Sequence, residues 1–168
     1  MDQSQLRSLQ APIKERYREA PDSAVVTLKA RGSLGEGIAC KVETGRALAV
    51  AGLHPASGGS GLELCSGDML LEALVACAGV TLKAVATALS IHLRNADILA
   101  EGDLDFRGTL GVAKDAPVGL RDIRLTFKLD TDATSETIDK LISLTERYCV
   151  VLQTLQVHPN ISVAAERV

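Results

Sequence analysis

The hydrophobic positions change their period several times along the chain, and each change predicts a different element. The charged segment 3–19, with Pro12 near its start and Pro21 beyond its end, predicts a short helix. Alternating apolar positions in 24–32 and 38–44 predict two strands, joined as a hairpin by a loop that contains three glycines. Residues 47–53 predict a third strand. A nearly continuous apolar run then predicts a long helix from Ser66, the expected cap, to about residue 90.

The second half of the chain alternates more clearly. Residues 96–111 and 123–130 place apolar side chains on one face and polar ones on the other, which predicts a long antiparallel hairpin with one solvated face. On that face we expect Arg124 and Lys128 to lie opposite the acidic residues of the first strand. Residues 134–149 predict an amphipathic helix, followed by a short helix at 150–155 and a last strand at 160–168.

This order of elements predicts one α+β domain over residues 1–168, with its helices on one face of antiparallel sheet. The segment 69–89 is apolar almost all round, so we expect that helix to be buried on several sides. Small residues along it would let another backbone approach closely: Ala73, Cys77, Ala84 and Ala88. The pattern therefore predicts a dimer that wraps the long helix.

Composition removes several classes of function. A net charge of −3 over 168 residues, without a basic stripe, argues against a nucleic-acid partner. The polar segment 1–21 lacks an apolar signal core, so we expect a cytoplasmic protein. Glu72 and Lys83 interrupt the apolar run 69–89, which favours a core helix over a membrane span. With no C-x-x-C and scattered histidines, the sequence predicts neither a metal site nor a cofactor.

Cysteines carry the remaining chemistry. Cys77 lies within the long helix, and Cys149 ends an apolar stripe of the second helix that also holds Ile138, Leu141, Ile142 and Thr145. Both thiols should point toward one core, where crossing helices would bring them within disulfide reach. Buried cysteine often packs as a small hydrophobe, so an inert pair is the alternative. A reactive Cys77 needs a nearby cation, for which Arg31 competes with Arg16, Arg18 and Arg46.

Two stretches resemble the OsmC/Ohr family of osmotically inducible and organic hydroperoxide resistance proteins. "SGDMLLEALVACAGVTL" is similar to the family's central-helix motif, and "ERYCVVLQTL" with the following "ISV" resembles its second-cysteine segment. The resemblance covers about residues 24–166, and leaves 1–22 as an N-terminal helical extension. It implies an intertwined homodimer, with antiparallel sheets wrapped around long central helices and active sites at the dimer interface.

The resemblance also implies roles for individual residues. Cys77 would be the peroxidatic thiolate and Cys149 the resolving thiol, with Arg31 as the activating arginine and Asp68 as its acidic partner. The expected reaction reduces organic hydroperoxides to alcohols through a Cys77 sulfenic acid and a Cys77–Cys149 disulfide, which an external dithiol reduces. Apolar walls from Leu74, Val75 and Val80 would favour organic peroxides over hydrogen peroxide.

The sequence departs from the family pattern at two points. It has "CSGDM" at the helix start where the family usually has Pro-Glu or Pro-x-Glu, and Val150 where a proline often follows the second cysteine. Cys65 is an additional thiol near the helix start, which we expect to pack, with a role as rival resolving thiol as the alternative. Cys40 is expected in the core.

Two other functions stay open. One is a non-catalytic dimer that binds a small apolar ligand, with thiols that only pack. The other is a thiol hydrolase or transferase, for which none of the histidines (His54, His92 and His158) is placed as an obvious base.

Overall fold

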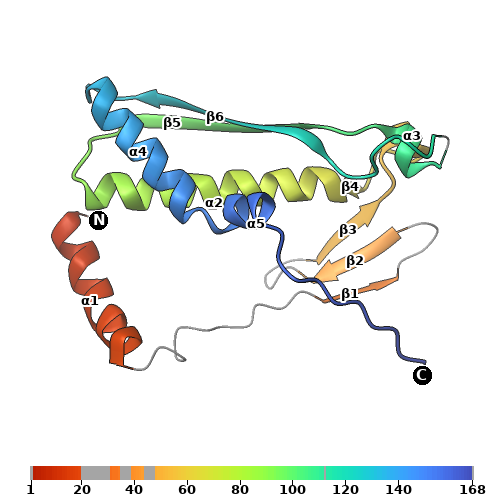
Figure 1. The fold of residues 1–168 in the computed structure, drawn as a ribbon, viewed down its shortest axis with the longest axis horizontal. Coiled ribbons are helices and arrows are strands. Elements are labelled where there is room, and N and C mark those ends of the chain that lie inside the picture. The colour runs from red at the N-terminus through yellow and green to blue at the C-terminus, as the bar shows by residue number, and fades with distance from the viewer. Residues whose placement is uncertain (1, 20–30, 35–38, 44–47, 112, 168) are drawn as a thin grey trace.

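The computed structural model describes residues 2–19, 31–34, 39–43, 48–111 and 113–167. Figure 1 shows the long helix α2 lying along a two-stranded sheet, with a four-stranded sheet near the start of that helix. The elements in chain order are α1 (Gln3–Glu19), β1 (Arg31–Leu34), β2 (Ala39–Glu43), β3 (Leu48–Gly52), a 3-10 turn (Pro55–Ser57), β4 (Leu64–Cys65), α2 (Ser66–Ala88), β5 (Asn95–Asp103), α3 (Phe106–Thr109), β6 (Arg121–Asp130), α4 (Ser135–Tyr148) and α5 (Val150–Gln156).

The helix α2 confirms the helix predicted from its apolar run, but within the single chain it buries one stripe and not several sides. Leu74, Ala78, Leu82 and Ala86 recur every four residues and are fully buried. The cap differs from the prediction, because Ser66 is the first helical residue and Cys65 occupies the N-cap position without a side-chain cap hydrogen bond. Asp68 lies in the first turn, where a negative charge is favourable.

The strands β5 and β6 pair antiparallel and cover the buried stripe of α2. Their inward residues alternate strictly, and Ile98, Phe127 and Leu129 pack against Leu82 or Leu74. On the other face Arg124 donates hydrogen bonds to both carboxylate oxygens of Asp103, at 2.9 and 3.0 Å. The predicted hairpin, with helices on one face and charges on the other, is confirmed over this length.

The first of these strands ends earlier than its alternating pattern suggests. Residues 106–109 form the short helix α3, because Asp105 caps it and accepts a hydrogen bond from the Arg107 backbone N–H at 3.1 Å. The prediction of a strand through residue 111 is therefore wrong beyond Asp103. Local capping outweighs alternation where the register of β5 and β6 has already shifted, between Glu101 and Asp103.

The four-stranded sheet has the order β1-β2-β3-β4. β1 pairs antiparallel with β2, β2 pairs antiparallel with β3, and β4 joins β3 in parallel. The predicted hairpin and third strand are present, although β1 begins at Arg31, and most of the predicted first strand lies outside the described residues. The pair β3 and β4 leads directly into the start of α2.

The helices α4 and α5 lie beside α2 and confirm the second amphipathic pattern. Leu141, Thr145 and Cys149 are fully buried at one-turn spacing, and Thr134 caps α4 through the Thr137 backbone N–H. Beyond α5, residues 157–167 form no strand, and their side chains are exposed. The last strand predicted for 160–168 is therefore absent over its described residues.

One face of α2 stays open within the single chain. Val80 is 73% exposed, and Ala73, Ala76 and Ala84 are exposed with it. By length and composition α2 is a candidate membrane span among the described residues, which is weak evidence for a single helix. Its buried stripe against β5 and β6 is that of a core helix, as its sequence predicts, and the open face is a separate apolar surface.

Candidate active site

The fold brings Cys77 and Cys149 together from two helices. Cys77 lies in the middle of α2, and Cys149 lies at the junction of α4 and α5, where it ends one helix and caps the next. Both pack in one cluster with Leu74 and Ala78. Cys77 is partly exposed and Cys149 is completely buried, and both are free thiols. A reagent from solvent therefore meets Cys77 first.

The surroundings of Cys77 favour its thiolate. Burial alone would raise its pKa, but the backbone N–H groups of Val151 and Val150, the Cys149 thiol and the Thr81 hydroxyl are donors near the sulfur that lower it. Together these donors outweigh burial and lower the pKa of Cys77. The two N–H groups are available because they begin α5, where the first amides of a helix lack intrahelical partners.

Cys149 is shifted in the opposite direction. Burial raises its pKa most, and the interaction with Cys77 raises it too, against lowering by the backbone N–H groups of Leu152 and Val151. The two opposite shifts belong to one interacting pair. The geometry thus favours ionisation of the accessible Cys77 thiol over that of the buried Cys149 thiol.

Sequence reasoning missed the donors that lower the pKa of Cys77. Thr81 follows Cys77 by four residues on the same helix face, a spacing visible in the sequence. The N–H groups of Val150 and Val151 carry no signal in residue type. Only the prediction that a short helix starts directly after Cys149 could have suggested them.

The side chain of the predicted activating arginine lies outside the described residues. Arg31 begins β1 and lies opposite Glu43 in the strand register, but the structure describes only its backbone. The side chains of Arg16 and Arg18, and all of Arg46, also lie outside the described residues. The activation of Cys77 by an arginine stays a prediction.

Asp68 lies on the opposite side of α2 from Cys77. It precedes Cys77 by nine residues, which is two and a half turns and about 14 Å along the axis. With Val75 it lines a groove between α2 and β5. Of the three predicted apolar walls, only Leu74 packs in the same cluster as Cys77, whereas Val80 belongs to the open face of α2.

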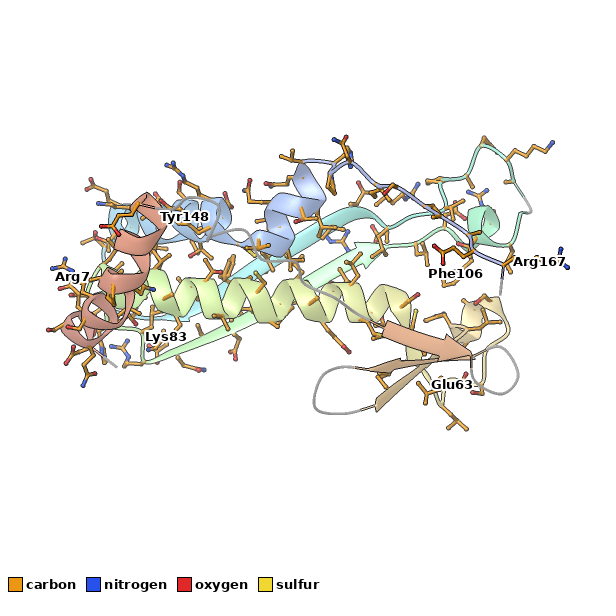
Figure 2. The ribbon with its side chains drawn as sticks, turned by 90° about the horizontal axis from the view of Figure 1, so that it is seen from below. Arg7, Glu63, Lys83, Phe106, Tyr148 and Arg167 are labelled. Carbon is orange, nitrogen blue, oxygen red and sulfur yellow. The ribbon has the colours of Figure 1, made fainter. Side chains whose placement is uncertain are left out.

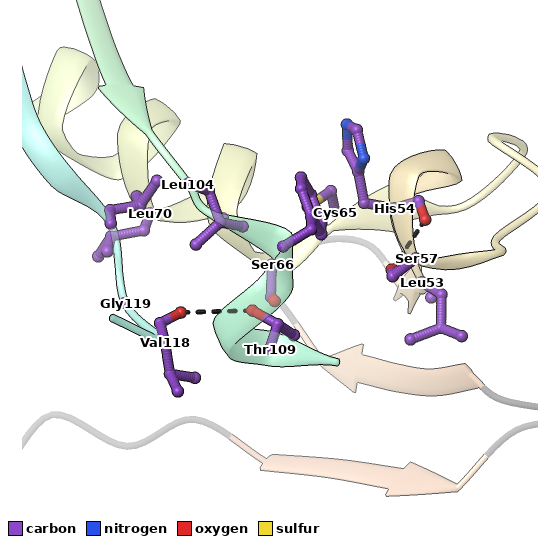
Figure 3. A pocket seen from close by; sticks show the side chains of 14 residues that line it. Leu53, His54, Ser57, Cys65, Ser66, Leu70, Leu104, Thr109, Val118 and Gly119 are labelled. Atoms are coloured by element: carbon purple, nitrogen blue, oxygen red, sulfur yellow. Dashed lines mark hydrogen bonds between the residues drawn. The ribbon is translucent and has the colours of Figure 1, made fainter. Parts of the chain in front are cut away.

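Cys65 lines a separate cavity at the start of α2. Figure 3 shows this cavity, of about 350 Å³, between the 3-10 turn after β3 and the connection from β5 to β6. The His54 ring stacks on Phe106 at its edge, with 5.0 Å between ring centroids. Cys65 precedes Cys77 by twelve residues, or about 18 Å of helix, so the single chain does not bring it to the thiol pair.

The described residues contain no candidate metal site. No group of three or more His, Cys, Asp or Glu side chains there is arranged to hold a metal ion. The thiol pair is the arrangement with chemistry of its own, since a thiolate is a nucleophile and two adjacent thiols can be oxidised to a disulfide.

Solved structures share this fold. An OsmC-like protein from Mycoplasma pneumoniae matches with a TM-score of 0.66 at 19% identity, over 78% of this chain and 88% of that one. An organic hydroperoxide resistance protein from Elizabethkingia anophelis, with thiocyanate bound, matches with a TM-score of 0.64 at 15% identity, over 80% and 91%. A protein described as organic hydroperoxide resistance protein OsmC, from Legionella pneumophila, gives 0.59 at 14% identity, over 79% and 91%. At these identities the likeness concerns the fold.

The fold and the paired thiols define an α+β protein with a dithiol site, in which one thiol lies on the central helix and the other at the junction of α4 and α5. The model of the family described as OsmC-like protein matches residues 59–164, which is more than half of the chain and includes both cysteines. The chain belongs to the OsmC-like family, as its two cysteine segments predict. Comparison with curated protein sequences gives no match.

Proposed function

We propose that this protein is a thiol peroxidase that reduces organic hydroperoxides to alcohols. The observation that carries the proposal is the division of the thiol pair, with a partly exposed Cys77 of lowered pKa against a buried Cys149 of raised pKa. Structural relatives from Legionella pneumophila and Elizabethkingia anophelis that are described as organic hydroperoxide resistance proteins support the substrate class.

In the first step the Cys77 thiolate attacks the terminal oxygen of the hydroperoxide. A sulfur–oxygen bond forms, the oxygen–oxygen bond breaks, and the leaving alkoxide takes a proton to become the alcohol. Cys77 becomes a sulfenic acid and is oxidised by two electrons. The donors near the sulfur favour the thiolate form of Cys77, and the thiolate is the nucleophile that this step requires.

In the second step Cys149 attacks the sulfenic sulfur of Cys77. A disulfide forms and water leaves, so the enzyme is protected from further oxidation. An external dithiol then reduces the disulfide by exchange and is itself oxidised. A reducing compartment, which we infer is the cytoplasm, would keep both thiols in the free state that the structure has.

The working protein is proposed to be a homodimer. The open apolar face near the start of α2, with Ala73 and Ala76 exposed, is suited to a second copy of this helix because small residues permit close approach. In that assembly Arg31 and Asp68 of either copy can complete the site at the interface. Analytical ultracentrifugation tests this part, and a monomer at micromolar concentration would contradict it.

The proposed activity is tested by hydroperoxide consumption with a dithiol reductant. We expect the wild-type protein to consume cumene hydroperoxide much faster than hydrogen peroxide, since apolar residues surround the thiol pair. Equal rates for the two peroxides would contradict the substrate class, and no consumption of either would contradict the function. Arg31→Ala should slow the first step, and an unchanged rate would remove Arg31 from the site.

A further inference from the structure

The N-terminal helix α1 lies outside residues 59–164, which match the family model. Its start is well defined, because Asp2 and Gln5 exchange two hydrogen bonds of 2.8 and 2.9 Å. The Gln3 side-chain amide donates to the Ala88 carbonyl at 2.6 Å. This bond anchors α1 to the C-terminal end of α2.

A cavity of about 400 Å³ lies between α1 and α2. Leu6 and Gln10 of α1 line one side of it, Thr81 and Val85 of α2 line another, and Tyr148 of α4 closes an edge. Figure 1 and Figure 2 show that α1 starts beside the C-terminal end of α2 and runs away from it. The Arg147 guanidinium lies 5.5 Å from the centroid of the Tyr148 ring and packs over it.

This cavity adjoins the thiol pair from both elements that carry it. Thr81 follows Cys77 by one helical turn on the same side of α2 and lines the cavity. Tyr148 directly precedes Cys149 and lines the cavity as well. On α2 the lining starts one turn beyond Cys77 and runs toward the helix end through Thr81, Val85 and Ala88. A molecule that reacts at Cys77 can therefore extend into this space.

The walls of this cavity suit the organic group of an alkyl or aryl hydroperoxide. Leu6, Val80, Ala84 and Val85 contribute aliphatic side chains, and such walls gain free energy by covering alkyl or aryl surface. Hydrogen peroxide has no group to place there. The cavity would then act on the part of the substrate that does not react.

We propose that α1 forms the outer wall of the subsite that holds the alkyl or aryl group of the hydroperoxide, and that Leu6 sets the size of this subsite. The inference rests on the proposed peroxidase function for its substrate, but the subsite itself can be tested without peroxide. α1 is thus a specificity element added to the family fold, and Leu6 is a specificity-determining residue that does not touch the reacting sulfur.

The test is the rate at which Cys77 is alkylated by N-ethylmaleimide and by N-octylmaleimide, quantified at Cys77 by peptide mass spectrometry. The wild-type protein should show a preference for the octyl reagent. Leu6→Trp fills the cavity and should lower the octyl-to-ethyl rate ratio by about tenfold, and Leu6→Ala should lower it less. Arg7→Trp is the matched control, because Arg7 is exposed on the same helix and is not among the lining residues.

Equal ratios in wild-type protein, Leu6→Trp and Arg7→Trp would overturn the proposal. Circular dichroism and sedimentation of each variant guard against misfolding, and the Leu6→Ala variant keeps the test valid if tryptophan prevents folding. The same variants are then compared with cumene hydroperoxide and tert-butyl hydroperoxide, where Leu6→Trp should lower the cumene-to-butyl ratio of kcat/KM. If the maleimide preference holds but no hydroperoxide is consumed, the subsite stands and the peroxidase function falls.

Discussion

Cys77 and Cys65 lie twelve residues apart on the same stretch of chain and have opposite surroundings. Cys77 sits in the middle of α2, where Thr81, Cys149 and the start of α5 all direct donors at its sulfur. Cys65 sits at the N-cap of α2 beside a cavity lined by Leu70 and Leu104, without a second cysteine among the lining residues. A place on α2 alone therefore does not lower the pKa of a thiol. The pKa of Cys77 is lowered because other elements bring donors to its sulfur.

The strongest way to break this comparison is to remove each sulfur in turn. Cys77→Ser should lower hydroperoxide consumption by at least about a thousandfold, because it removes the nucleophile. Cys65→Ser is the matched control and should keep the wild-type rate. Stopped-flow consumption of cumene hydroperoxide measures both. A Cys65→Ser variant as inactive as Cys77→Ser would contradict the account, because it would mean that Cys65 is required for the reaction.

Removal of Cys149 should separate the two steps of the reaction. Cys149→Ser should still consume one equivalent of hydroperoxide and then hold Cys77 as a sulfenic acid, because the thiol that closes the disulfide is gone. A dimedone adduct at Cys77, detected by mass spectrometry, measures this. Steady-state turnover that is unchanged in this variant would show that Cys149 does not resolve the sulfenic acid.

The packing beneath the two cysteines should differ in the same direction. Leu74 is fully buried beside Cys77, so Leu74→Ala should lower the free energy of unfolding by about 2–5 kcal/mol. Leu70 lines the Cys65 cavity and is 39% exposed, so Leu70→Ala should cost about 1 kcal/mol or less. Urea denaturation of both variants measures the difference. Equal losses would mean that the two regions are packed alike.

The smallest expected effect concerns the Thr81 hydroxyl. Thr81→Val removes one donor from the Cys77 sulfur, so the pKa of Cys77 should rise toward its ordinary value and alkylation at neutral pH should slow. Thr87→Val is the control on the same helix, because its hydroxyl donates to the Lys83 carbonyl at 2.8 Å instead. The pH dependence of the alkylation rate measures both variants. Identical profiles would remove Thr81 from the set of donors.

Much of the fold follows from periodicity in the sequence. The buried stripe of α2, the alternation of β5 and β6 and the stripe that ends at Cys149 are all long, regular patterns, and each predicts its element with the correct face. The misplaced boundaries have local causes. Cys65 rather than Ser66 caps α2, and the Asp105 cap starts α3 where alternation continues in the sequence. The segment after α5 has a strand pattern but forms no strand over its described residues.

The site is predictable in part. Two apolar stripes that each contain a cysteine are enough to suggest that Cys77 and Cys149 meet, and the structure brings them into contact. The donors that lower the pKa of Cys77 could not be foreseen, since the backbone amides of Val150 and Val151 depend on the path of the chain rather than on residue type. The role of Arg31 stays a prediction, because no sequence spacing ties an arginine in an early strand to a distant helix.

The central claim is that Cys77 and Cys149 form one redox pair. The most direct measurement treats the fully reduced protein with less than one equivalent of cumene hydroperoxide and maps its disulfides by peptide mass spectrometry. The predicted result is a loss of two hydrogens, located in a Cys77–Cys149 bridge. An unchanged mass, a bridge that joins Cys77 to Cys65, or scattered oxidation without the Cys77–Cys149 bridge would contradict it.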